Sequence, residues 1–187
     1  GAGKSTLLKI LSGELESTEG NIVKDKKITI SVLKQNQFEF DEYNVIDTVI
    51  IGDEAMYECY SERNRIYGLE EMSEEDGLKV AQYEADYSEM DGYEKEANAG
   101  SMLDELGISS EFHELKMNQL DSSQKVRVLL AQALFGNPDV LLLDEPTNQL
   151  DFRTALWLEE KLIEYENTVI VVSHDRHFLN KVCTHIA

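Results

Sequence analysis

The spacing of apolar residues divides the chain into helical stretches and a few strand-like runs. Residues 4–13 (KSTLLKILSG) carry apolar side chains at helical spacing and end on Gly13, a residue that commonly closes helices. Residues 27–33 (KITISVL) alternate apolar and polar side chains, which predicts a strand. A polar loop and a short apolar segment follow, and the pattern becomes helical again over residues 52–106.

Residues 52–106 are predicted to form three helices that pack mainly on one another. The middle helix opens with Ser73 and Asp76, three residues apart, which is the spacing of a capping box. The apolar positions expected on the packed faces are Ala55, Met56, Cys59 and Tyr60 in the first helix, Val80, Tyr83, Tyr87 and Met90 in the second, and Ala97, Leu103 and Leu106 in the third.

Two continuous apolar runs, residues 139–145 (DVLLLDE) and 168–175 (TVIVVSHD), fit strands that are covered on both faces, as in a parallel sheet. Between them, residues 153–165 (RTALWLEEKLIEY) have the pattern of a crossover helix. Helical spacing also occurs over residues 123–136. Strands that alternate with helices predict an α/β core with a mostly parallel sheet.

The acidic helices are therefore expected to form an inserted subdomain or arm. We divide the chain into a partial core at residues 1–51, a helical subdomain with an acidic arm at 52–118, and the remainder of the core at 119–187.

Charge is distributed unevenly along the chain. The formal net charge is −20, from 17 basic and 37 acidic residues. Residues 53–105 hold 17 acidic and 4 basic residues, a net of −13, which leaves −7 for the rest. This balance argues against broad non-specific binding of nucleic acid. No apolar run reaches the length that spans a bilayer, and two cysteines without zinc spacing suit a reducing compartment, so we expect a cytoplasmic protein.

The first residues, GAGKST, match the end of a phosphate-binding loop, G-x-x-x-x-G-K-[ST]. Gly3, Lys4 and Ser5 occupy its last three positions, so the chain is expected to begin inside this motif. Glycines allow backbone amides to approach phosphates, the lysine reaches the β- and γ-phosphates, and the serine hydroxyl ligates Mg²⁺. The nucleotide-binding residues expected here are Gly1, Ala2, Gly3, Lys4, Ser5 and Thr6.

The run VLLLDE ends a predicted strand with two adjacent carboxylates. Asp144 would be delivered to the carboxyl edge of the sheet, where P-loop NTPases hold Mg²⁺ with an aspartate. Glu145 follows the strand and can turn toward the nucleotide, where a carboxylate would polarise the attacking water. The order of this pair after the GKST run strengthens the prediction of an ATP and Mg²⁺ site.

Three further segments resemble the motifs of ATP-binding cassette (ABC) ATPases. LLLDEPTNQLD resembles the Walker B motif and D-loop of that family, with Asp151 as the D-loop aspartate. VVSHDRHFL resembles the switch-histidine segment and implies that His174 supports the γ-phosphate. LKQNQ resembles the Q-loop, which makes Gln35 the expected contact for Mg²⁺ and water, with Gln37 as the alternative register.

The family's signature, usually L-S-G-G-Q, corresponds here to Leu120, Asp121, Ser122, Ser123 and Gln124. In the family this segment contacts the γ-phosphate of ATP held by an opposite cassette. Asp121 places a carboxylate where a hydroxyl would face an anion, and like charges repel by about 1 kcal/mol at about 4 Å in water. The resemblance therefore implies that the ATP site completed by this signature is weakened.

EPTNQLD and the segment after the switch histidine resemble the ABC-F branch, and the acidic helices resemble the arm of the first cassette in YbiT-type ABC-F ATPases. The resemblance implies ATP hydrolysis, a second cassette on the same chain, and action on the ribosome through rRNA, tRNA or a ribosomal protein. Two alternatives stay open, an ATP-binding subunit of a membrane transporter and a module that uses ATP as a clamp. Because half of the phosphate-binding loop is missing, residues 1–187 alone are expected to bind ATP poorly.

Overall fold

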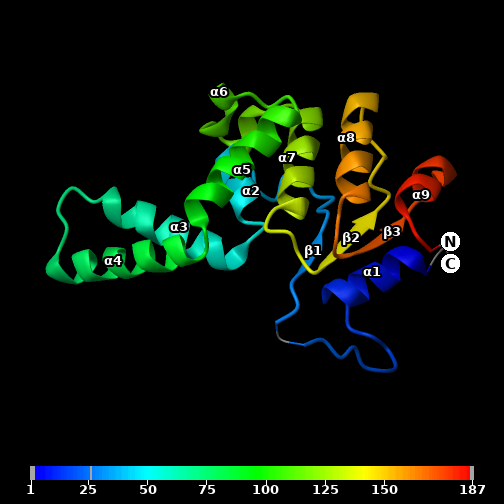
Figure 1. Ribbon diagram of the computed structural model, residues 1–187, viewed down its shortest axis with the longest axis horizontal. Helices are drawn as coiled ribbons and strands as arrows, with labels where there is room; N and C mark the ends of the chain where they lie inside the picture. The colour runs from blue at the N-terminus through cyan, green and yellow to red at the C-terminus, as the bar shows by residue number, and fades with distance from the viewer. Residues whose placement is uncertain (1–2, 26, 186–187) are drawn as a thin grey trace.

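The computed structural model describes residues 3–25 and 27–185 (Figure 1). In chain order the elements are α1 (Lys4–Ser12), β1 (Ile30–Val32), α2 (Val45–Ile50), α3 (Glu54–Tyr67), α4 (Glu74–Glu89), α5 (Gly92–Glu105), α6 (Ser110–His113), the 3₁₀ helix η1 (Met117–Gln119), α7 (Ser122–Leu134), β2 (Val140–Asp144), α8 (Phe152–Ile163), β3 (Thr168–Val172) and α9 (Arg176–Val182). The predicted α/β fold with a parallel sheet and inserted helices is confirmed.

The described sheet has three parallel strands in the order β1-β2-β3. Only β2 is central, and three of its five residues are buried. The prediction that the second apolar run is covered on both faces is wrong for β3, since none of its residues is buried. It lies at the edge of the described sheet, where the described elements cover its side chains only in part. Strand β1 is shorter than predicted, since the Thr29 amide donates to the Asp139 carboxylate at 2.8 Å instead of to the ladder.

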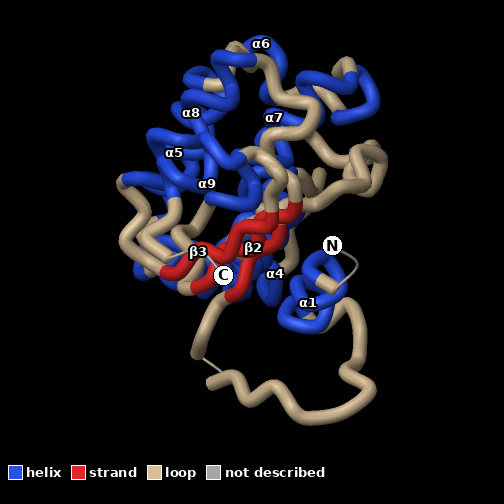
Figure 2. Tube along the Cα trace, turned by 90° about the vertical axis from the view of Figure 1, so that its right-hand side faces the viewer, coloured by secondary structure: helices blue, strands red, loops and turns tan. Residues whose placement is uncertain are grey.

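Helices lie on both faces of this sheet. Helix α1 packs against β1 and β2. Helices α7 and α8 lie on the opposite side of the strands in Figure 1, and the view of Figure 2 shows the same separation. Gly13 ends α1 in the left-handed conformation, with φ +83°, as its position in the sequence predicts.

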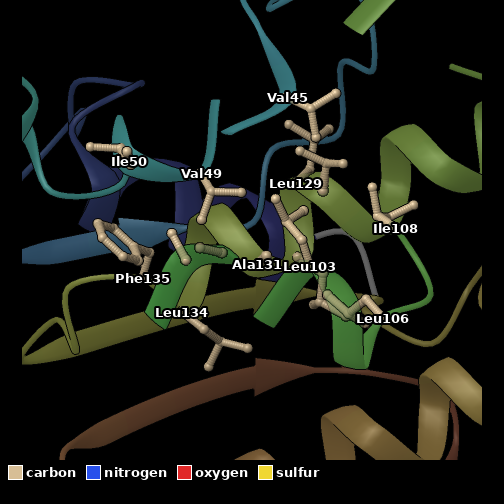
Figure 3. Close-up of a cluster of buried hydrophobic side chains, with 14 of the residues drawn as sticks. Val45, Val49, Ile50, Leu103, Leu106, Ile108, Leu129, Ala131, Leu134 and Phe135 are labelled. Atoms are coloured by element: carbon tan, nitrogen blue, oxygen red, sulfur yellow. The ribbon is translucent and has the colours of Figure 1, made fainter. Parts of the chain in front are cut away.

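The main hydrophobic core lies where α2, α5 and α7 meet (Figure 3). Val49 on α2, Leu103 on α5 and Leu129 on α7 are all essentially inaccessible to solvent. The Gln132 side chain on α7 also donates to the Thr48 carbonyl at 2.8 Å. Helix α7 therefore packs with the helical layer, although the sequence-based division placed it with the last part of the core.

Helices α3 and α4 form a hairpin that projects from the rest of the molecule (Figure 1). The predicted capping box is confirmed, since the Asp76 amide donates to the Ser73 hydroxyl and the Ser73 amide donates to the Asp76 carboxylate. Most of the predicted packed faces are confirmed, but Ala55 on α3 and Ala97 on α5 are exposed. Ala55 is the second residue of α3 and lines an open cavity, which leaves it exposed. Ala97 lies two positions before the buried Ala99, about 200° around the helix from it, so it faces solvent.

The base of this hairpin is built around the buried side chain of Arg63 on α3. Its guanidinium carbon lies 4.1 Å from the centre of the Tyr87 ring and 5.4 Å from that of Tyr93. The carboxylates of Glu84 and Glu96 each lie 3.9 Å from guanidinium nitrogens. Because these partners come from α4 and α5, Arg63 connects the arm to the helical layer.

Candidate nucleotide-binding site

The carboxyl ends of three adjacent parallel strands bring the predicted catalytic segments to one edge of the sheet. Asp144 is the last residue of β2 and pairs in register with Val172, the last residue of β3. Leu33, just after β1, donates its amide to the Leu142 carbonyl at 3.1 Å. The loops that follow the three strands therefore start side by side, as ligand sites do in open α/β sheets.

Asp144 has the environment expected of a metal ligand. Its Oδ1 atom is buried and makes no hydrogen bond with any of the described residues. A buried carboxylate oxygen without a partner is costly, and a hard cation such as Mg²⁺ satisfies it. No group of three or more His, Cys, Asp or Glu side chains that could hold a metal ion occurs in the described parts of the chain. Mg²⁺ is usually held by one or two protein groups together with water and phosphate.

Glu145 is held in an uncommon conformation directly after β2. Its φ is +47°, in the left-handed region that residues other than glycine rarely adopt, and its amide donates to the Val172 carbonyl at 2.7 Å. The Glu145 carboxylate accepts a hydrogen bond from the His174 amide at 3.2 Å and lies 3.5 Å from Nε2 of the His174 ring. Such strain gathers at functional sites, and here it directs the carboxylate toward the switch-histidine loop.

His174 lies at the open face of this edge, with 84% of its side chain exposed. The next residue, Asp175, caps α9 by accepting from the amides of His177 and Phe178. The cap fixes the loop after β3, so His174 is presented to solvent next to Glu145. The arrangement leaves its ring free to meet a ligand.

The start of α1 carries the remaining predicted phosphate ligands. Lys4, Ser5 and Thr6 are exposed in its first turn, while Gly1 and Ala2 lie outside the described residues. In Figure 1 the N-terminal end of α1 lies on the same side of the molecule as the arrowheads of β2 and β3. Amides at a helix N-terminus attract anions, so this end suits a phosphate chain.

The D-loop residue Asp151 caps α8. Its carboxylate accepts from the Thr154 amide at 2.9 Å and from the Thr154 hydroxyl at 3.0 Å. The hydrogen bond from this backbone amide lowers the pKa of the Asp151 carboxyl, so the side chain stays ionised as a cap. This structural task accompanies the functional role that the family resemblance implies.

The two candidate Q-loop glutamines differ in their contacts. Gln35 is exposed, whereas the Gln37 side chain donates to the Gln149 side chain of the D-loop at 2.9 Å. Which of them contacts Mg²⁺ and water stays a prediction. The contact between Gln37 and Gln149 joins residues 112 positions apart, and sequence reasoning missed it because nothing local marks such a pair.

The signature residues lie at the N-terminal end of α7. Leu120 is buried, whereas Asp121, Ser122 and Ser123 are exposed. The Asp121 carboxylate accepts from the Gln124 amide at 2.8 Å, and the Gln124 side chain accepts from the Asp121 amide at 3.0 Å. Asp121 is thus an N-cap in a reciprocal capping box, a role that sequence reasoning missed although the D-x-x-Q spacing carries it.

The signature residues are separate from the sheet edge that carries Asp144, Glu145 and His174. Within residues 3–25 and 27–185, no hydrogen bond or ion pair joins Asp121 to Asp144, Glu145 or His174. A cavity of about 750 Å³ lies elsewhere, between β1, the turn from α2 to α3, and residues 132–138. Its lining includes none of Lys4, Asp144, Glu145 or His174. The candidate site is therefore an open edge of the sheet, not this cavity.

The sequence model described as ABC transporter matches residues 1–148, most of the chain. The chain belongs to the ABC transporter family. Members of this family are ABC ATPases, which bind ATP, generally with Mg²⁺. The match includes Asp144 and Glu145 at the sheet edge.

The curated relatives of this ABC cassette include two bacterial proteins of ABC-F type. Both are 56% identical over 187 residues: the uncharacterized ABC transporter ATP-binding protein YkpA of Bacillus subtilis (strain 168) and the probable ATP-binding protein YbiT of Escherichia coli O157:H7. Each match covers 100% of this chain and 35% of the relative, so the chain spans about a third of their length. It corresponds to their N-terminal cassette.

Solved structures agree with this family. The ABC cassette MJ0796, described as a dimer in a post-hydrolysis state bound to ADP and Pi, superposes with a TM-score of 0.60 and 26% identity. The match covers 97% of this chain and 74% of that one. Among the described helices, none combines the length and the apolar character needed to cross a membrane.

Proposed function

We propose that the chain is the first ATP-hydrolysing cassette of an ABC-F protein that acts on the ribosome in translation control. The observation that supports it best is the meeting of Asp144, Glu145 and His174 at one sheet edge, with an unpartnered buried oxygen on Asp144. Identity to YbiT and YkpA supports the ABC-F branch. The complete protein is proposed to be cytoplasmic and to contain a second cassette.

The chemistry we propose is hydrolysis of the bond between the β- and γ-phosphates of ATP. Lys4 and the amides of residues 1–6 hold the phosphates, and Ser5, Asp144 and a Q-loop glutamine hold Mg²⁺, directly or through water. The Mg²⁺ ion, when bound, offsets the negative charge on the phosphate oxygens. Glu145 orients the attacking water and accepts its proton, because its carboxylate is already fixed beside His174. His174 contacts the γ-phosphate.

The signature of the second cassette completes the site that binds this ATP. Reciprocally, Leu120, Asp121, Ser122, Ser123 and Gln124 face the ATP of that cassette, together with the D-loop residue Asp151. ABC cassettes dimerise, and the matched MJ0796 structure is described as a dimer. The exposed position of residues 121–123 supports a role at such an interface.

Hydrolysis is tested with the complete protein and its Glu145→Gln variant. We expect turnover to fall at least about 100-fold while ATP still binds, because the amide keeps the shape of the side chain but cannot accept the proton. Glu159→Gln on α8, whose carboxylate forms an ion pair with Lys181, serves as the control. Equal turnover in the Glu145→Gln variant and the parent would overturn the assignment of Glu145.

Ribosome action is tested by sedimentation. The complete protein, with Glu145→Gln and the matching change in the second cassette, is centrifuged with ribosomes in ATP and in ADP. Sedimentation with ribosomes in ATP alone supports the proposal and identifies the closed form as the binding form. A protein that stays in the supernatant but co-purifies with a membrane protein would contradict the ABC-F role and support a transporter subunit.

A further inference from the structure

The segment that follows β1 is paired through its backbone with the segment that leads into the signature. The Asn118 amide donates to the Asp41 carbonyl at 3.2 Å, and the Met117 amide donates to the Tyr43 carbonyl at 2.9 Å. Asn44 and Lys116 form an antiparallel bridge. Residues 41–44, which follow the candidate Q-loop glutamines, therefore lie along residues 116–118, shortly before Leu120 and Asp121.

A buried ion pair adds to this backbone contact. Lys125 lies in the first turn of α7, directly after the signature, and is only 5% exposed. Its ammonium donates to the Asp41 carboxylate at 2.5 Å and lies 4.9 Å from the centre of the Phe38 ring. Asp41 is the sole carboxylate within 4.0 Å of this ammonium among the described residues. Burying a lysine without a partner is costly, so this contact constrains where the first turn of α7 can lie.

The same loop is held at its other end by the D-loop. The Gln37 side chain donates to the Gln149 side chain at 2.9 Å. Gln37 lies four residues before Asp41, which bonds to Lys125. The turn between them is closed by hydrogen bonds from the Phe38 amide to the Asn36 side chain and from the Asp41 amide to the Phe38 carbonyl. Residues 37–41 thus form a short, internally bonded connection with one anchor in the D-loop and one in α7.

We infer that residues 37–41 are a brace between the D-loop and α7, and that Asp41 and Lys125 are positioning residues that hold the signature, residues 120–124, for the ATP of the second cassette. The inference rests on the proposed function for the identity of that ATP. In this role neither residue needs to contact the nucleotide itself. They act through the first turn of α7, whose amides and hydroxyls carry the signature contacts.

The variants that test the brace are Lys125→Met and Asp41→Asn, singly and together, in the complete protein. Met keeps the length of the side chain and its contact with Phe38 but removes the charge. Lys125→Arg should preserve the pair and act as the conservative rescue. The matched control is the pair of Glu75 and Lys79 on α4, whose atoms lie 2.7 Å apart but are exposed and far from the signature, changed as Lys79→Met.

Hydrogen exchange of peptides covering residues 117–125 measures the position of the first turn directly, without ATP. We expect exchange about fivefold to tenfold faster in Lys125→Met and in Asp41→Asn, with no further increase in the double variant, since both changes break one bond. Lys125→Arg and Lys79→Met should leave it unchanged. Unchanged exchange in both single variants, or effects that multiply in the double variant, would overturn the brace.

Turnover per bound nucleotide gives the functional readout. A fluorescent ATP analogue first measures the binding stoichiometry, so that a loss of folded protein is not mistaken for slower catalysis. In a Glu145→Gln background, where the ATP of the second cassette is the one hydrolysed, we expect kcat per bound nucleotide to fall about tenfold in Lys125→Met with KM within about twofold, because the signature acts after ATP is bound. A change in KM alone would contradict a signature role. Absence of turnover in the parent protein would contradict the proposed function instead, and hydrogen exchange would still decide the brace.

Discussion

The arm hairpin offers a test of how a buried arginine contributes to stability, through the substitution Arg63→Met. The Arg63 side chain is 9% exposed, and the loss of one partner from a buried ion pair typically costs about 3–5 kcal/mol because it strands the other charge. Here we expect a much smaller loss. The reason is that neither carboxylate near Arg63 depends on it alone.

The contacts of these carboxylates set the magnitude. Glu96 accepts from the Tyr87 hydroxyl at 2.7 Å, and Glu84 accepts from the hydroxyls of Tyr93 at 2.6 Å and Tyr67 at 2.9 Å. The hydrogen bond from Tyr93 lowers the pKa of the Glu84 carboxyl, so it stays ionised without the arginine. Both carboxylates are also about one-third exposed, and at 3.9 Å each ion pair contributes only about 0.5 kcal/mol.

Two stronger effects of the arginine oppose each other. The contact of the guanidinium with the Tyr87 ring is desolvated and contributes about 2 kcal/mol. Nη1 of Arg63 is buried without any hydrogen-bond partner among the described residues, which costs about 1–3 kcal/mol, and Met removes that cost. We therefore expect Arg63→Met to lower the free energy of opening of the hairpin by only about 1 kcal/mol, which corresponds to about fivefold faster exchange.

Hydrogen exchange of peptides covering α3 and α4 in the complete protein measures this free energy of opening. Arg65→Met, on the same helix but at an exposed pair with Glu62, is the control and should have no measurable effect. A loss above about 3 kcal/mol would show that Glu84 and Glu96 rely on the guanidinium, and that their tyrosine partners do not suffice.

Three further predictions concern two glycines, the signature cap and the exposed carboxylate of Glu105. Gly52→Ala would place a methyl group in steric conflict with the Gln132 carbonyl and should destabilise the protein by about 3 kcal/mol or more in chemical denaturation. The added methyl group of Gly77→Ala meets no atom within 4 Å and should stabilise α4 by about 0.5–1 kcal/mol, and equal effects of the two changes would contradict the close packing of α2 on α7. Asp121→Ser keeps an N-cap and should change stability by less than about 0.5 kcal/mol, whereas Asp121→Ala should cost about 1 kcal/mol. Asp121→Ser should also raise ATP turnover at the second cassette, and unchanged turnover would count against electrostatic weakening of that site by the carboxylate. The hydrogen bond from the Lys161 ammonium, and next that from the Trp157 ring N–H, lower the pKa of the Glu105 carboxyl, so its contribution to stability is fully present above the ordinary glutamate pKa and is lost as the pH falls through the lowered value. Glu105→Gln should cost about 0.5 kcal/mol at pH 7 in thermal unfolding, and a difference from the parent that does not shrink as the pH falls below the ordinary glutamate pKa would refute this linkage.

Features whose cause lies in neighbouring residues could be predicted from the amino-acid sequence. The candidate site was predicted from three motifs in their chain order, namely the GKST run, the pair of Asp144 and Glu145, and His174. Each motif can be recognised from a few neighbouring positions. Helix periods, the cap at Ser73 and the end of α1 at Gly13 were predicted for the same reason, since backbone geometry couples residues one turn apart.

Features that depend on distant partners emerged only with the packing of the chain. The bond between Asp41 and Lys125 joins residues 84 positions apart, and neither residue stands in a pattern that marks it as buried. The exposure of β3 and of Ala55 likewise depends on which elements cover them, not on their own periodicity. The left-handed backbone of Glu145 arises where β2 must leave the sheet while its amide still bonds to β3. Local sequence fixes a residue's chemistry, but its partners, and thus its burial and orientation, follow only from how the chain packs.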